Sequence, residues 1–172
     1  INFQHKKNDS QTILVANETP KNSKRESESS VDKIAFGETG TTNDKSLFCI
    51  SSGNTDINHV SEYPQKNIEE SIHDPAQAFN ALTIGSITHK TVIDQTQFRG
   101  AIPLVRTGGM SPSNSTSLSW DNNWALKPEI VMEGGNYGVH NDSIIDPDSL
   151  RLLSIGKNFR TEPLHSFGDT SG

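Results

Sequence analysis

Cysteine and basic residues are scarce in this 172-residue sequence, and long apolar runs are missing from it. The only cysteine is Cys49, so no disulfide can form within these residues and no cysteine-rich metal site exists. Lys and Arg number 15 against 21 Asp and Glu, and the basic residues are scattered, so we expect no nucleic-acid partner. No apolar run is long enough to cross a bilayer, so we expect no membrane partner either. No spacing of side chains is typical of a metal or cofactor site, and we expect neither.

The rest of the composition is that of an ordinary globular domain. With 31% apolar and 21% charged residues, a chain of this length can bury a single hydrophobic core. The sequence begins with Ile1 instead of methionine, and we expect it to be a piece of a longer polypeptide. Its ends then carry no information on targeting, and the cellular compartment stays open.

The first third of the chain is expected to contain little regular structure. Residues 4–30 are rich in Lys, Asn, Ser and Glu and indicate a long surface loop, with at most one short strand over the apolar residues 13–16. Ser30 can cap a short helix over about 30–36, whose apolar residues recur with helical spacing. Gly37 is placed to end that helix.

Two apolar segments predict strands of a buried sheet. Residues 46–52 contain the continuous apolar run 47–50, which is typical of a strand buried on both faces of a parallel sheet. Residues 81–88 are rich in β-branched side chains and predict a second strand. Asn54 would follow the carboxyl end of the first strand, where open α/β sheets bind their ligands.

Four short segments, in one order along the chain, carry a resemblance to a known family. They are Ser51-Ser52-Gly53-Asn54 after the first strand, Asn80-Ala81 leading into Thr83-Ile84-Gly85-Ser86, Lys127-Pro128-Glu129-Ile130 with the following Gly134-Gly135-Asn136, and Gly168-Asp169-Thr170-Ser171-Gly172. A weaker fifth match is Met110-Ser111-Pro112-Ser113. In this order the segments resemble the subtilisin-like serine peptidases, or subtilases, over about residues 46–172.

The resemblance implies a fold, an activity and site residues. It implies an α/β fold with a mostly parallel β-sheet flanked by helices, incomplete in this fragment, and hydrolysis of peptide bonds in a peptide or protein substrate. Ser171 would be the nucleophile and Asn54 would donate a hydrogen bond to the oxyanion. Ser51, Ser52 and Gly53 would line the pocket for the side chain before the cleaved bond.

The same resemblance assigns residues 1–172 to the C-terminal part of one catalytic domain. Residues 89–125 would be inserted loops, and residues 150–172 would form a hairpin that delivers the nucleophile turn. The family's catalytic aspartate and histidine lie in motifs of the type Asp-Ser/Thr-Gly and His-Gly-Thr, and neither occurs here. A serine hydroxyl needs a base, so we expect this piece to be inactive without the N-terminal part of the same domain, its expected partner.

One departure from the family pattern and two alternatives accompany this interpretation. Asp169 stands where the family usually has glycine, and none of the six histidines is a convincing base, so we treat all six as surface residues. One alternative is a non-catalytic binding or scaffold domain, including a degenerate subtilase fold. The other, less favoured, is an esterase, because Gly168-Asp169-Thr170 is similar to the Gly-Asp-Ser block of that group; such a block opens its domain, however, and here it closes the chain.

Overall fold

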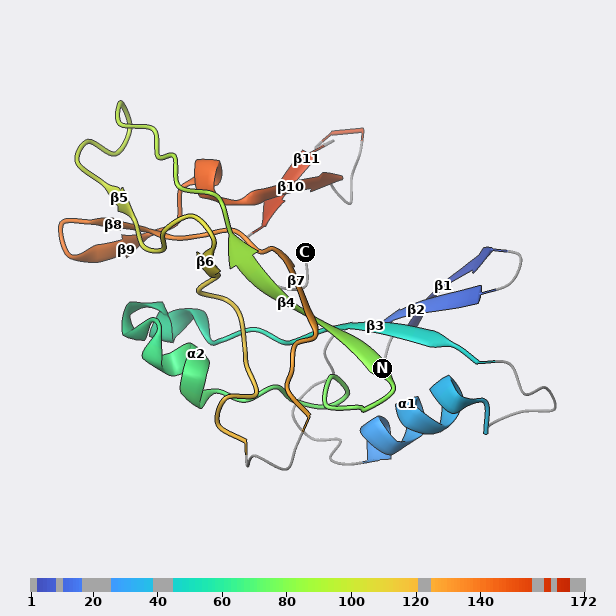
Figure 1. Cartoon of the computed structure of the whole chain (residues 1–172). Helices are drawn as coiled ribbons and strands as arrows, with labels where there is room; N and C mark the ends of the chain where they lie inside the picture. Colours follow the sequence, from blue (N-terminus) through green and yellow to red (C-terminus); the bar gives the residue numbers. More distant parts are fainter. Residues whose placement is uncertain are drawn as a thin grey trace.

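The central element of the molecule is a six-stranded mixed β-sheet (Figure 1). The computed structural model describes residues 3–8, 11–16, 26–38, 45–120, 125–155, 160–161 and 164–167. The six strands are β1 (Phe3–Asn8), β2 (Gln11–Ala16), β3 (Leu47–Ser51), β4 (Ala81–Thr88), β6 (Gly109–Met110) and β7 (Ile130–Glu133). Strands β2, β3, β4 and β7 run parallel to one another, whereas β1 pairs antiparallel with β2 and β6 pairs antiparallel with β4.

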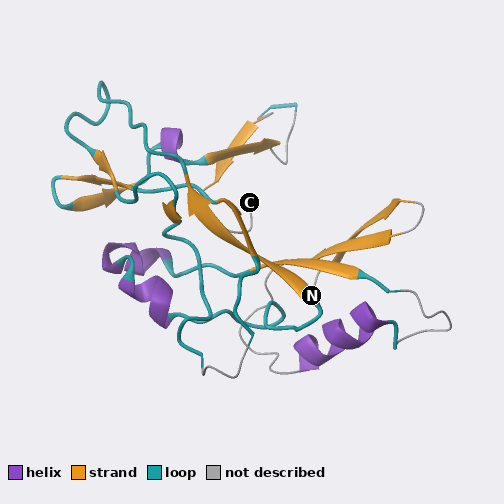
Figure 2. Ribbon diagram, in the orientation of Figure 1, coloured by secondary structure: helices purple, strands orange, loops and turns teal. Residues whose placement is uncertain are grey.

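Two small antiparallel sheets and a few short helices complete the described structure. Strand β8 (Gly138–His140) pairs with both β5 (Ile102–Pro103) and β9 (Ser143–Ile145), and β10 (Leu152–Ile155) pairs with β11 (Leu164–Phe167). The helices are α1 (Glu26–Phe36), α2 (Gln65–Glu69) and the 3-10 turns η1 (Ile57–Glu62) and η2 (Asp148–Leu150). In Figure 2, α1 and α2 lie below the central strands. None of the described helices is long and apolar enough to cross a bilayer.

Helix α1 ends as its sequence predicts, although it begins earlier. Gly37 has φ of 86°, a left-handed conformation that glycine adopts without strain. Its N–H donates to Ile34 O at 3.1 Å, and the next N–H, of Glu38, donates to Lys33 O at 2.9 Å. This pair of hydrogen bonds is a Schellman motif, which satisfies carbonyl groups at a helix end. The first residue of the helix is Glu26, four positions before the predicted start.

The main hydrophobic core lies between α1 and one face of β3 and β4. Val31 and Ala35 of the helix join a cluster with Phe48 and Ile50 of β3, and Trp120 packs against the same cluster. The sequence predicted that both faces of β3 would be buried, but the other face is only partly covered. Cys49 is half-buried there and Leu47 is 46% exposed. The side chains of β3 therefore alternate between buried and more exposed positions, because among the described elements only one face of the strand is covered by a helix.

The predicted second strand and the C-terminal hairpin form, whereas residues 4–30 differ from the prediction. Strand β4 spans the predicted residues 81–88, and the hairpin expected after residue 150 is formed by β10 and β11. Residues 4–30, by contrast, are not one long loop, because β1, β2 and the first residues of α1 lie within them. The β8–β9 hairpin was not predicted. Its turn residues Asn141 and Asp142 have φ of 50° and 59°, a conformation that these two residue types tolerate better than most.

Candidate active site

The turn after β3 holds Asn54 at the carboxyl end of the parallel strands. The N–H of Ser52 donates to Ile84 O at 2.8 Å, which extends the pairing of β3 with β4 one residue past the strand. Gly53 then has φ of 97°, so the chain turns away from the sheet in a conformation that favours glycine. Asn54 follows, half-buried, and forms an isolated antiparallel bridge with Asn114. The sequence-predicted oxyanion donor thus lies on a turn that is fixed on both sides.

Ser51 and Ser52, both predicted to line a pocket, have different surroundings. Ser52 is buried, and its hydroxyl donates to Asn114 Oδ1 at 3.1 Å. Ser51 is half-buried and lies opposite Ile84 in the pairing of β3 with β4. Within the described part of the chain, its hydroxyl has no hydrogen-bond partner. The Ser52 hydroxyl therefore holds the turn, while that of Ser51 is not used by the described residues.

A buried loop, residues 111–117, joins the ends of β3, β4 and β7. The N–H of Ser111 donates to Ser86 O at 3.0 Å, and its hydroxyl donates to Gly135 O at 3.0 Å. Asn114 accepts a second hydrogen bond at its side-chain oxygen, from the N–H of Ser86 at 2.8 Å. This loop contains the Ser111-Pro112-Ser113 turn of the sequence resemblance. All seven of its residues are buried, although their side chains are small and mostly polar.

Two buried asparagines beside the Asn54 turn were not found from the sequence. Asn114 is 2% exposed and Asn67, on α2, is 1% exposed. Asn114 begins an Asn-Ser-Thr triplet, and Asn67 lies in a polar stretch, so both are typical of solvent-exposed positions in sequence. Their burial depends on partners that are tens of residues away, and no local pattern in the sequence reports it.

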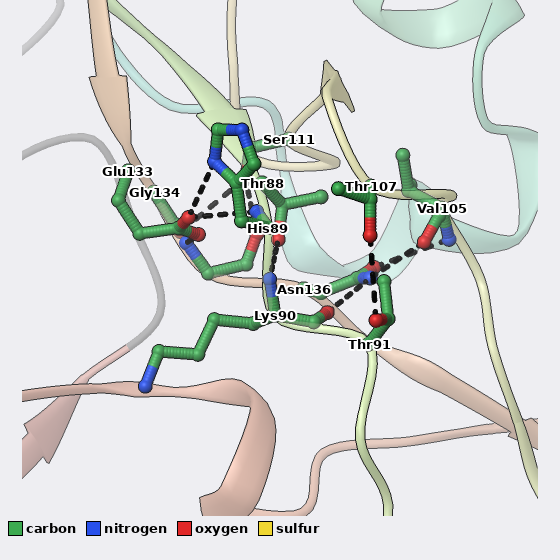
Figure 3. Close-up of polar contacts among 11 residues, drawn as sticks. Thr88, His89, Lys90, Thr91, Val105, Thr107, Ser111, Glu133, Gly134 and Asn136 are labelled. Carbon is green, nitrogen blue, oxygen red and sulfur yellow. Dashed lines mark hydrogen bonds and ion pairs between the residues drawn. The ribbon is translucent and has the colours of Figure 1, made fainter.

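The ends of β4 and β7 carry a second polar cluster, which Figure 3 shows. Glu133 Oε2 accepts from the N–H of His89 at 2.7 Å and lies 3.3 Å from His89 Nδ1, while Oε1 accepts from the N–H of Gly135 at 3.1 Å. Asn136 Nδ2 donates to the carbonyl oxygens of Lys90 at 2.8 Å and Val105 at 2.9 Å. The Gly134-Gly135-Asn136 segment is thereby joined to the residues that follow β4.

The segment that leads into β7 is held by a buried ammonium group. The side chain of Lys127 is fully buried, and its Nζ donates to Ala81 O at 2.9 Å and lies 2.6 Å from Glu129 Oε1. Glu129 Oε2 accepts from the N–H of Thr83 at 2.8 Å. The Lys-Pro-Glu residues of the sequence resemblance therefore bind the start of β4 to the start of β7.

The histidines whose side chains the structure describes are half-buried or exposed, as expected for surface residues. His59 Nδ1 lies 2.6 Å from Glu62 Oε1, and this hydrogen bond holds the pKa of the Glu62 carboxyl below its usual value. His165 is exposed on β11. Within the residues that the structure describes, there is no group of three or more His, Cys, Asp or Glu side chains that could hold a metal ion.

Ser171, with the whole of Gly168–Gly172, lies outside the described residues. Strand β11 ends at Phe167, immediately before that segment. The described residues therefore include the predicted oxyanion donor and its surroundings, and the place of the nucleophile stays a prediction.

Comparison with protein families gives one match. The sequence model described as the Subtilase family matches residues 8–172, which include every segment of the sequence resemblance. Comparison with the curated proteins and with the solved structures finds no match.

Proposed function

Because the chain belongs to the subtilase family, we propose that it is the C-terminal part of the catalytic domain of a serine endopeptidase, with Ser171 as its nucleophile. Family membership assigns it at the coarse level to a group of peptidases. The finer assignment depends on Ser171 as nucleophile, on Asn54 as oxyanion donor, and on the predicted pocket residues, which are Ser51, Ser52 and Gly53.

The observation that best supports this proposal is the rigid presentation of Asn54. An oxyanion donor is effective when it is held in place before the reaction, because it then needs no reorganisation as charge develops. Asn54 lies at the carboxyl end of β3 and bridges Asn114 of a fully buried loop. Both neighbours, Gly53 and Thr55, are buried, whereas Asn54 is only half-buried. Part of its surface is therefore accessible on an otherwise buried turn.

The proposed reaction has two stages. Ser171 Oγ attacks the carbonyl carbon of the scissile peptide bond while a histidine imidazole removes the hydroxyl proton, and the carbonyl oxygen becomes an oxyanion. Asn54 Nδ2 and a backbone N–H near Ser171 donate hydrogen bonds to this oxyanion. The intermediate collapses, the C–N bond breaks, and the leaving amine takes the proton from the imidazolium. A water molecule then hydrolyses the acyl-enzyme by the same steps and regenerates Ser171.

The histidine and the aspartate that orients it are proposed to come from the N-terminal part of the same catalytic domain, since this sequence contains neither family motif. Ser51, Ser52 and Gly53 are proposed to line the pocket for the substrate side chain before the cleaved bond. The Ser52 hydroxyl is bonded to Asn114. Its contribution to that pocket would therefore be its backbone.

Covalent labelling tests the proposal. A fluorophosphonate probe is expected to label Ser171 in the full-length polypeptide and not in the 172-residue chain alone, which lacks the base. Labelling should disappear in Ser171→Ala and persist in Ser154→Ala, a matched change at an exposed serine of β10. Equal labelling of wild type and Ser171→Ala would remove Ser171 from the nucleophile role. A full-length polypeptide that is never labelled would favour a non-catalytic domain.

A further inference from the structure

We propose that Asn67 is a positioning residue for the Asn54 amide, an inference that rests on the proposed function above. Asn67 lies on the short helix α2, thirteen positions after Asn54, and was not singled out by any motif. Asn67 is 1% exposed, and its side-chain amide connects the Asn54 turn to the buried loop 111–117.

The side-chain hydrogen bonds of Asn67 are all made by its amide nitrogen. Its Nδ2 donates to Pro112 O at 2.7 Å and to Asn114 O at 2.8 Å, and lies 3.2 Å from Thr55 Oγ1. An amide nitrogen carries two hydrogens, which matches the two short contacts to carbonyl oxygens. Thr55, the residue after Asn54, joins the same network, because its hydroxyl donates to Asn114 O at 3.1 Å.

The backbone of Asn67 also takes part. Its carbonyl oxygen accepts from the Thr116 hydroxyl at 3.1 Å, so helix α2 is attached to the loop at both Asn114 and Thr116. The N–H of Thr55 donates to Ser113 O at 2.9 Å. The Asn54 turn, the loop and α2 are thus three segments that are held together by one buried polar network.

This arrangement explains how the network can affect the rate of the proposed reaction as well as the stability of the fold. The Asn54 turn is fixed on its N-terminal side by Ser52, which bonds Asn114, and on its C-terminal side by Thr55, which lies against Asn67 and Asn114. A hydrogen-bond donor of a reaction must be held within a fraction of an ångström, since a displacement of about 1 Å can cost about 100-fold in rate. Loss of the Asn67 amide would remove one of the contacts that hold Thr55 and Asn114 together and would loosen the C-terminal side of the turn.

The test is Asn67→Asp in the full-length polypeptide. The aspartate has nearly the same shape but no donor, and its carboxylate would face the carbonyl oxygens of Pro112 and Asn114. We expect kcat for a peptide substrate to fall by about tenfold to 100-fold, with KM unchanged. Asn141→Asp, the same change on the exposed β8–β9 turn, is the matched control and is expected to keep wild-type kcat.

A double-mutant cycle with Asn54→Ala separates positioning from general damage. If Asn67 acts through Asn54, the loss from Asn67→Asp disappears once Asn54 is replaced by alanine. Losses that multiply in the double variant, or a wild-type kcat in Asn67→Asp, would overturn the inference. If Asn54→Ala itself leaves kcat unchanged, the proposed oxyanion role fails instead, so the two failures are distinguishable.

A second substitution decides the question if Asn67→Asp does not fold. Thr55→Val removes the hydroxyl that lies between Asn67 and Asn114 O and keeps the volume of the side chain. It is expected to lower kcat with KM unchanged, and only in the presence of Asn54. Thr55→Ser keeps the hydroxyl and should keep wild-type kcat. Equal kcat for Thr55→Val and Thr55→Ser would contradict the proposal.

Discussion

Ser52 and Asn114 are 62 positions apart in the sequence, and the Ser52 hydroxyl donates to Asn114 Oδ1 at 3.1 Å in the buried interior. The same oxygen accepts from the N–H of Ser86 at 2.8 Å, so one side-chain atom holds both the end of β3 and the end of β4. The turn that carries Asn54 is therefore positioned by a residue from a distant loop and not by β3 alone.

The first prediction concerns Asn54 itself. Asn54→Ala in the full-length polypeptide is expected to lower kcat by about 100- to 1,000-fold with little change in KM, because the donor acts on the oxyanion and not on the bound substrate. This range was established on subtilisin itself and is carried over here. In an intact site, the Asn54 amide and the Ser171 hydroxyl should lie within about 6 Å of each other. Steady-state kinetics on one peptide substrate and a structure of the full-length polypeptide check these two statements; unchanged turnover would remove Asn54 from the mechanism.

The second prediction concerns the close contact of β4 with Gly134. A Cβ atom at Gly134 would lie 2.3 Å from Ser86 Cβ, so Gly134→Ala should force the two segments apart and lower the free energy of unfolding by about 1–3 kcal/mol. Urea denaturation measures this loss. Adding Ser86→Gly removes both clashing atoms and should restore part of the loss, whereas Ser86→Ala removes only the Oγ, at 2.6 Å, keeps the Cβ and should restore less. Equal restoration by both would contradict the steric explanation.

The third prediction concerns the buried lysine. Lys127→Met leaves Ala81 O without its donor and Glu129 without its cation, and we expect the free energy of unfolding to fall by about 2 kcal/mol. Lys90→Met is the matched control, because the Lys90 side chain points away from the polar cluster in Figure 3 and only its backbone is bonded there. The control should unfold within about 0.5 kcal/mol of wild type. A Lys127→Met protein that is as stable as wild type would show that the ion pair contributes nothing net.

The fourth prediction concerns alkaline pH. Burial raises the pKa of the Tyr63 phenol above its ordinary value of 10.0, and the protonated phenol donates to Met110 O at 3.0 Å. A raised folded-state pKa stabilises the folded protein fully below pH 10 and loses that contribution as the pH rises through the folded pKa. We therefore expect wild type to lose more stability than Tyr63→Phe between pH 8 and a pH above 10. Urea denaturation at the two pH values measures the difference; parallel losses would exclude this role for Tyr63.

Local sequence signals predicted those elements whose cause is local. The β-branched run of residues 81–88 forms β4, and Gly37 ends α1 because its left-handed φ is accessible to glycine at no steric cost. Residues 3–8 carry no comparable apolar run, yet they pair with β2 along their whole length. Their strand depends on a partner and not on their own composition. The β8–β9 hairpin had a usable signal in Asn141-Asp142, the kind of residue pair that tolerates a tight hairpin turn.

The sequence by itself determined the family, the order of the motifs and the position of Asn54 after β3, because strands and glycine turns are specified by residues close together in the chain. Only the tertiary structure decided which polar residues support that turn. Asn67 and Asn114 lie in mostly polar stretches that do not predict burial, and their buried amides are satisfied by hydrogen-bond partners on segments far from them in sequence. A buried amide is stable only when such partners meet it, and no pattern of neighbouring residues specifies that meeting.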